Sequence, residues 1–112
     1  MSKELEERTK RFSLAAIRFC STVRHGRTED VLVRQLIRAA TSIGSNYREA
    51  NRAVSRADFR NKIGIVQKEA AETQYWIELI NESDRAQPTL LAPICIASRP
   101  SWWQSLRASA RN

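Results

Sequence analysis

The sequence predicts an all-α fold, an antiparallel up-and-down helical bundle, and three observations lead to this prediction. Apolar residues recur at steps of three and four along three segments of about two dozen residues, as one buried face of a helix requires. Short turns with capping residues separate these segments, so neighbouring helices must run antiparallel. No strand-like run, internal repeat or low-complexity tract precedes residue 84. The 112 residues, 42% of them hydrophobic, are enough for one domain with a modest core, so we expect a single domain over 1–112.

The first helix is predicted over about residues 3–24. Its apolar residues at helical spacing are Leu5, Phe12, Ala16, Phe19 and Val23. After it comes Gly26, which suits the C-terminal end of a helix, and Thr28, which suits an N-cap with acidic residues behind it. We therefore expect a tight turn into a second helix that begins at about residue 28.

The second helix is predicted over about residues 28–53, although its middle turns contain several poor helix formers. Its inward positions alternate steps of four and three along Leu32, Leu36, Ala39, Ile43, Asn46 and Ala50. Small residues around Gly44 let a neighbouring backbone come close, and Gly64 of the third helix is the candidate for the opposing contact.

Asn46 is the unusual member of this series, because a polar side chain facing other helices needs hydrogen bonds. The candidate partners are the carboxylates of Glu49, Glu69 and Glu72. Buried polar pairs of this kind commonly fix the register or the assembly state of a bundle, and they need no catalytic role.

The third helix is predicted over about residues 56–82. Ser55 suits its N-cap, with Asp58 in the first turn. The inward positions again alternate four and three along Phe59, Ile63, Val66, Ala70, Thr73, Ile77 and Ile80. Beside them lie Tyr75 and Trp76, an aromatic pair that suits either a subunit interface or the protein's own core, and we favour the core for Trp76.

Residue types that carry enzyme and metal chemistry are scarce. The one histidine, His25, falls in a predicted turn, and Cys20 and Cys95 have no metal-ligand spacing. We therefore expect no catalytic site, no metal and no cofactor, and small buried or half-buried thiols. Glu69 and Glu72 lie one turn apart without a ligating histidine, so we interpret them as polar contacts of the bundle.

The sequence also lacks membrane and export signals. No segment approaches the roughly 18 apolar residues of a membrane span, and the first ten residues lack the apolar run of a signal peptide. We expect a cytoplasmic protein with no membrane partner.

Basic residues exceed acidic ones, with a formal net charge of +7 and a pI near 10.3, which favours an anionic partner. Four arginines share one stripe of the second helix, because steps of four, ten and four return to the same face; they are Arg34, Arg38, Arg48 and Arg52. Arg56 and Arg60 extend this basic surface past the turn. The stripe spans roughly 27 Å at 1.5 Å per residue, enough to touch several phosphates.

These six arginines are the candidate nucleic-acid-binding residues, because arginine makes bidentate contacts with phosphate and stacks on unpaired bases. An alternative is that they pair with Glu49, Asp58 and Glu69 on neighbouring helices or subunits, since stripes of surface charge are usually solvated faces.

Residues 35–80, QLIRAATSIGSNYREANRAVSRADFRNKIGIVQKEAAETQYWIELI, carry a resemblance to a known family. The motifs RAATSIGSNYREA, SRADF and KEAAETQYWIELI resemble the central signature of the four-helix-bundle proteins named for intervening sequences in bacterial 23S ribosomal RNA. That family is similar in fold to the accessory variability subunit of diversity-generating retroelements. The resemblance implies a four-helix subunit that assembles into a homopentameric ring, has a basic face suited to nucleic acid, and has no established enzymatic activity.

The divergent C-terminal segment, residues 85–112, departs from that pattern, so we expect an atypical or degraded fourth helix. It contains all three prolines, no acidic residue and the adjacent Trp102 and Trp103. Tryptophan has the single codon TGG, and with common codons for its neighbours SRPSWWQS reads as PAELVAI one register earlier. We hypothesise that a frameshift near residues 95–99 replaced most of the helix.

Two functions from different classes fit these observations. One is a ring that binds RNA or DNA and works with a nucleic-acid enzyme as partner. The other is a protein-interaction scaffold or adaptor without a nucleic-acid role. Replacing the stripe arginines by glutamine should abolish binding in the first case and change nothing in the second.

Overall fold

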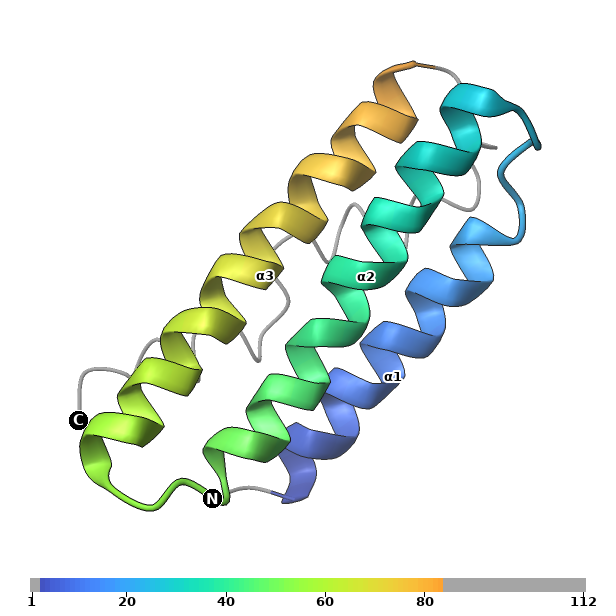
Figure 1. Ribbon diagram of the computed structural model, residues 1–112. Helices are drawn as coiled ribbons and strands as arrows, with labels where there is room; N and C mark the ends of the chain where they lie inside the picture. Colours follow the sequence, from blue (N-terminus) through green and yellow to red (C-terminus); the bar gives the residue numbers. More distant parts are fainter. Residues whose placement is uncertain (1–2, 84–112) are drawn as a thin grey trace.

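The computed structural model describes residues 3–83, and this part of the chain forms three α-helices. They are α1 (Lys3–Cys20), α2 (Arg27–Ala50) and α3 (Arg56–Glu82). Each helix runs antiparallel to the one before it (Figure 1). The all-α prediction is confirmed, whereas the predicted fourth helix falls on residues outside the described range.

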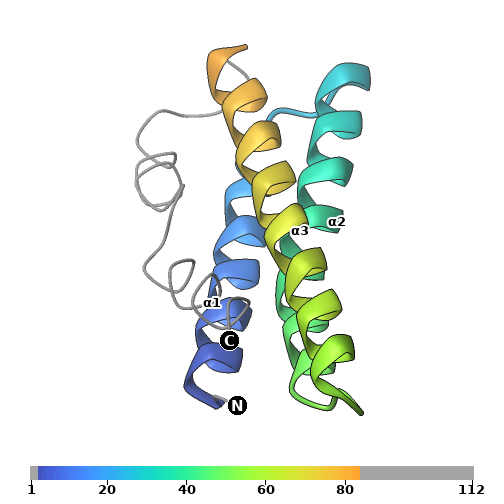
Figure 2. The same ribbon diagram turned by 90° about the vertical axis from the view of Figure 1, so that its left-hand side faces the viewer.

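Helix α2 is the middle helix of the three. It packs against both α1 and α3, while the backbones of α1 and α3 do not approach one another within the described residues. Figure 2 shows the three helices from the side. Among the described residues, α2 therefore lies between α1 and α3.

The core consists of two apolar clusters along the bundle. The first lies toward the α1–α2 connection and contains Ala16, Phe19, Cys20, Val23, Leu36, Ala40, Ile77 and Ile80. The second lies toward the α2–α3 connection and contains Leu5, Ile43, Tyr47, Ala50, Ile63, Val66 and Ala70. Phe12 packs against both clusters, so α1 links the two halves of the core.

The buried face of α2 is wider than the predicted seam. Leu36, Ala39, Ile43 and Ala50 are buried as predicted, but Tyr47 is also 99% buried and Asn46 only half-buried. The physical reason is that α2 packs against two neighbouring helices. It therefore buries a wider part of its surface than a helix with a single partner would.

The contact predicted between the two helix-interior glycines is wrong. Gly44 is buried and approaches α1, because a Cβ built on it would lie 3.3 Å from Thr9 Oγ1. Gly64 is exposed, with nothing within 4 Å of a Cβ built there. The small residue at position 44 therefore lets α1 and α2 come close, and position 64 has no packing role among the described residues.

The start of α3 agrees with prediction, whereas α2 ends at Ala50, before the predicted residue 53, and the turn between α1 and α2 also differs. Ser55 caps α3, its Oγ accepting a hydrogen bond from Asp58 N at 3.0 Å. At the other turn α1 already ends at Cys20, and Gly26 occupies the N-cap position of α2 without a side-chain cap. Thr28 therefore lies inside α2. The carboxyl group of Glu29 folds back over Gly26, where any larger residue would collide with it.

Candidate nucleic-acid interface

All six candidate arginines are exposed. Arg34, Arg38 and Arg48 lie on α2, Arg52 lies in the turn just after it, and Arg56 and Arg60 lie in the first turns of α3. The structure therefore brings the six together along α2 and around its C-terminal end. Their guanidinium groups are accessible to a large anionic partner.

Two of the stripe arginines form ion pairs, one with each neighbouring helix. Arg38 Nη2 donates a hydrogen bond to Glu72 Oε1 of α3 at 3.1 Å. Arg48 Nε lies 3.8 Å from Glu6 Oε1 of α1, which is too long for a hydrogen bond. Both arginine side chains are about half exposed, at 56% and 52%. Exposed pairs of this kind contribute about 0.2–1 kcal/mol, so they leave both arginines available to a phosphate.

Two of the three carboxylates predicted as partners in the pairing alternative, those of Glu49 and Asp58, have other contacts. Glu49 pairs with Lys62 of α3 at 3.4 Å, and Asp58 Oδ2 accepts a hydrogen bond from Val54 N at 3.3 Å. Pairing does occur, but it uses Glu6 and Glu72. Within residues 3–83, no ion pair is found for Arg34, Arg52 or Arg56.

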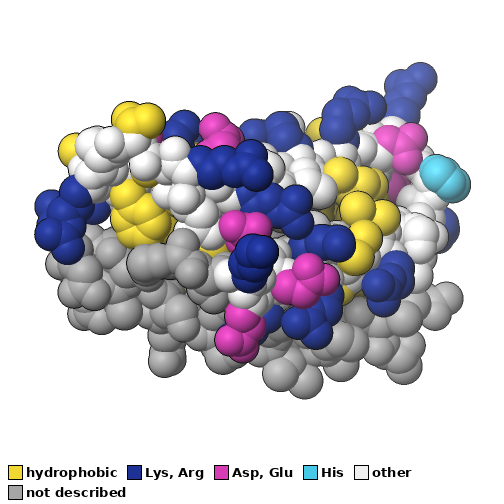
Figure 3. Space-filling model, turned by 90° about the horizontal axis from the view of Figure 1, so that it is seen from below, with side chains coloured by type: hydrophobic (Ala, Val, Ile, Leu, Met, Phe, Trp, Pro, Cys, Tyr) yellow, Lys and Arg dark blue, Asp and Glu magenta, His cyan; other side chains and the backbone are white. Residues whose placement is uncertain are grey.

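The surface of the molecule carries both signs of charge. Figure 3 shows lysine and arginine side chains spread over one face with acidic side chains between them, and apolar surface next to the histidine. Among the exposed apolar side chains are Leu14 and Ile17 of α1 and Val31 of α2. The basic character of this face is therefore a local excess, and its cations are interleaved with carboxylates.

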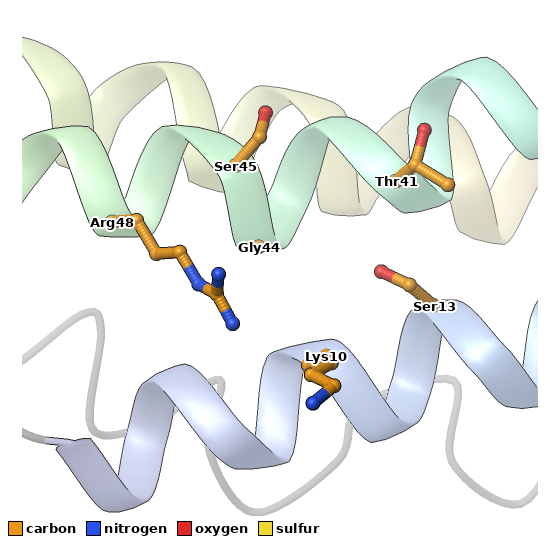
Figure 4. Close-up of a pocket in the computed structure, with 6 residues that line it drawn as sticks. All are labelled: Lys10, Ser13, Thr41, Gly44, Ser45 and Arg48. Atoms are coloured by element: carbon orange, nitrogen blue, oxygen red, sulfur yellow. The ribbon is translucent and has the colours of Figure 1, made fainter.

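A hollow of about 320 Å³ lies between α1 and α2 beside this stripe. Its lining residues are Lys10 and Ser13 from α1 and Thr41, Gly44, Ser45 and Arg48 from α2. Figure 4 shows the guanidinium group of Arg48 reaching from α2 toward α1, with the hydroxyl of Ser13 directed toward α2. The hollow combines two cations with three hydroxyl groups.

Asn46 does not reach the carboxylates predicted for it. Its Nδ2 donates a hydrogen bond to Ser42 O of the preceding turn at 2.8 Å, and the side chain is half-buried. The amide is therefore satisfied within α2, and the proposed interhelical pair is wrong.

Glu69 and Glu72 serve different purposes despite their one-turn separation. Glu72 pairs with Arg38 at 3.1 Å, in agreement with a polar contact between helices. Glu69 is only 5% exposed, and its Oε2 has no hydrogen-bond partner in the described part of the chain. Glu69 O accepts a bond from Thr73 Oγ1 at 2.8 Å.

Trp76 belongs to the core, as favoured from the sequence. It is half-buried and packs against the first apolar cluster, and Tyr75 beside it is 54% exposed. The two rings meet edge to face with centroids 5.3 Å apart. Tyr75 thus keeps an aromatic surface open at the outside of α3.

The other reactive side chains within residues 3–83 are those of Cys20 and His25. Cys20 is a buried free thiol, and burial raises its pKa to about 11. His25 lies in the α1–α2 connection, fully exposed, with Nδ1 3.6 Å from Asp30 Oδ1. Residues 3–83 contain no cluster of three or more His, Cys, Asp or Glu side chains suited to a metal ion. None of the three described helices is long and apolar enough to cross a bilayer.

Sequence reasoning missed the contribution of α1 to this surface. Lys10, Ser13 and Glu6 were not selected, because each falls on a polar position of an ordinary amphipathic helix. Only the approach of α1 at Gly44 brings these side chains beside the arginine stripe. A helical wheel of α1 alone carries no signal for it.

Residues 3–93 match the family model described as 23S rRNA-intervening sequence protein. The chain is also similar to a crystal structure, at 1.70 Å resolution, of a protein with unknown function from the S23 ribosomal protein family of Bacteroides thetaiotaomicron VPI-5482. The two sequences are 31% identical, the TM-score is 0.84, and the match covers 96% of this chain and 99% of that chain. The comparison with curated proteins gave no match.

Proposed function

Because the chain belongs to the 23S rRNA-intervening sequence protein family, we propose that it is a non-enzymatic helical subunit that binds RNA or another nucleic acid. The observation that carries this proposal is the outer face of α2, where exposed arginines follow one another and continue past the turn to Arg56 and Arg60. The ion pairs of Arg38 with Glu72 and of Arg48 with Glu6 are weak enough for phosphate to replace the carboxylates.

The proposal extends to assembly and to the completed fold. A homopentameric ring, which the resemblance implies, would repeat the arginine stripe by its symmetry and raise the avidity for a long polyanion. A fourth helix from the residues beyond the described range would complete the four-helix bundle that the resemblance implies. A nucleic-acid enzyme is the partner that such a ring would serve.

Binding of the purified protein to a structured RNA fragment and to a matched DNA duplex, measured across a salt series, tests the proposal. Each phosphate contact releases counterions and adds roughly 0.7–0.9 to the slope of log affinity against log salt. We expect a slope for about three or more contacts. The variant R34Q/R38Q/R48Q/R52Q should lower the slope by up to about 3 and retain the helical circular dichroism of the parent.

A second quadruple variant controls for net charge. The variant K3Q/R11Q/R18Q/K68Q also removes four positive charges, but from exposed positions of α1 and α3. If both variants weaken binding equally, the interaction follows bulk charge and the stripe is not the binding face. If the correctly assembled parent protein binds neither nucleic acid, the proposal fails and a protein partner becomes the function to pursue.

A further inference from the structure

We propose that the hollow between α1 and α2 holds a backbone phosphate, with its attached sugar, of the nucleic acid that follows the arginine stripe. This inference rests on the proposed function and adds a specific binding site to it. The residues that would form the site come from both helices, and only Arg48 among them belongs to the stripe.

The cations of the hollow can turn to a new anion at low cost. Lys10 Nζ lies 3.8 Å from Glu7 Oε1, and Arg48 Nε lies 3.8 Å from Glu6 Oε1. Both distances exceed that of a hydrogen bond, so the two carboxylates do not occupy the donor groups of Lys10 and Arg48 with short bonds. A phosphate between them would accept charge-assisted hydrogen bonds from α1 and α2 at once.

The hollow exists because its floor carries no large side chain. Gly44 has none, and the lining residues other than the two cations are the short Ser13, Thr41 and Ser45. The volume of about 320 Å³ falls at the lower end of the roughly 300–1,000 Å³ typical of ligand sites. That is more room than a single carboxylate of a protein partner requires, and it suits a phosphate together with a sugar.

The position of the hollow favours a continuous polyanion over an isolated acidic side chain. Thr41 and Ser45 lie on α2 between Arg38 and Arg48, so a strand that passes from one arginine to the other crosses the hollow. The separation of ten positions between these arginines corresponds to roughly 15 Å of helix at 1.5 Å per residue. Successive phosphates of one strand can therefore meet Arg38, the hollow and Arg52 in turn.

Two variants with matched controls test the site. Lys10→Gln removes one cation of the hollow, and Lys68→Gln removes the same charge from an exposed position on α3. Ser45→Leu places an apolar side chain at the exposed edge of the hollow without changing charge, and Asn61→Leu places the same side chain on an exposed position of α3. Affinity for the structured RNA fragment is measured across the salt series, and light scattering follows the assembly state.

We expect Lys10→Gln to lower the salt slope by roughly 0.7–0.9, the contribution of one phosphate contact. Ser45→Leu should weaken binding about fivefold and also lower the slope, because an apolar side chain at the edge of the hollow obstructs the approach of the phosphate to Lys10 and Arg48. Lys68→Gln should leave the slope within about 0.3 of the parent value, and Asn61→Leu should leave the affinity within twofold.

The possible failures are distinct. If the parent protein binds RNA and both hollow variants behave like their controls, the phosphate site is wrong and the proposed function stands. If Lys10→Gln or Ser45→Leu changes the assembly state, the hollow is an interface between copies of the chain, and the site is overturned. If the parent protein does not bind nucleic acid, the site and the proposed function both fall.

Discussion

The two glycines inside helices make a matched pair for testing the packing of α1 on α2. Gly44→Ala and Gly64→Ala are the same chemical change in the middle of two long helices. Their surroundings differ, because Gly44 faces Thr9 at close range and Gly64 faces open space. The two substitutions should therefore change the free energy of unfolding by different amounts, with a gain expected only at position 64.

The magnitudes follow from helix propensity and from the space available. Alanine is more favourable than glycine in a helix interior by about 1 kcal/mol, and at position 64 this gain meets no opposing contact. At position 44 the new Cβ would lie 3.3 Å from Thr9 Oγ1 and 3.6 Å from the carbonyl carbon of Thr9. Thr9 is fully buried and its hydroxyl donates to Glu6 O at 2.9 Å, so it cannot move aside freely.

Overpacking of a rigid site costs about 1–3 kcal/mol. Gly44→Ala should therefore be neutral or destabilising by up to about 2 kcal/mol, because the cost of crowding offsets or exceeds the propensity gain. The two variants should differ by about 1–3 kcal/mol. For a domain of this size, each kcal/mol moves the melting temperature by about 4 °C.

Urea denaturation followed by circular dichroism at 222 nm measures both variants against the parent protein, at equal concentration and with the assembly state checked by light scattering. A stability gain at position 44 as large as that at position 64 would refute the reasoning, since it would mean that α1 and α2 are not in close contact at Thr9.

Four other predictions rest on the structure, and a fifth rests on the sequence alone. Tyr47→Ala should cost about 3–5 kcal/mol in urea denaturation, whereas Tyr75→Ala, at a half-exposed position, should cost much less. Ser55→Ala should lower the stability by about 0.5–2 kcal/mol through loss of the α3 cap, and Ser55→Asp should retain it. The pKa of Cys20, raised from 9.0 to about 11, predicts alkylation at pH 8 roughly a hundredfold slower than for an exposed thiol, as measured by mass spectrometry of Cys20 peptides. The same shift contributes stability that is fully present below pH 9 and is lost as pH rises toward 11, because the thiol of the unfolded chain ionises first. Resequencing the gene should give a reading frame that encodes PAELVAI in place of SRPSWWQS; an intact frame in close relatives that also encodes SWWQS would contradict the frameshift.

Periodicity was sufficient to predict the three helices and most of their buried residues. Every seam position of α3 from Ile63 to Ile80 is buried, because α3 packs on α2 along one line and a strict alternation of four and three describes such a line. Ser55 was predictable for a local reason, since an N-cap depends only on the residues of its own first turn.

The choice between Asn46 and Tyr47 was beyond the sequence. Both residues fit a helix, and which one is buried depends on where α1 packs on the surface of α2. Tyr47 faces the cluster that includes Leu5 of α1, so its burial is a property of the pair of helices. The prediction that Gly64 packs against Gly44 failed for the same reason, because spacing within one helix does not say which helix lies opposite.

The charges of the candidate site were likewise predictable within one helix and unpredictable between helices. The arginine stripe could be predicted because it repeats within α2, whereas its competitors, Glu6 and Glu72, come from α1 and α3 and flank it on both sides. These carboxylates limit the net positive potential of the surface, and they do so most at low salt, where exposed ion pairs are strongest.

A polyanion must compete with these carboxylates for Arg38 and Arg48. In the proposed function a polyanion meets several cations at once, whereas each carboxylate meets one. On that proposal the flanking carboxylates set a minimum length for the ligand, because a small anion or an isolated acidic side chain replaces only one of them. The proposal therefore predicts a preference for a chain of phosphates long enough to span Arg34, the hollow and Arg52.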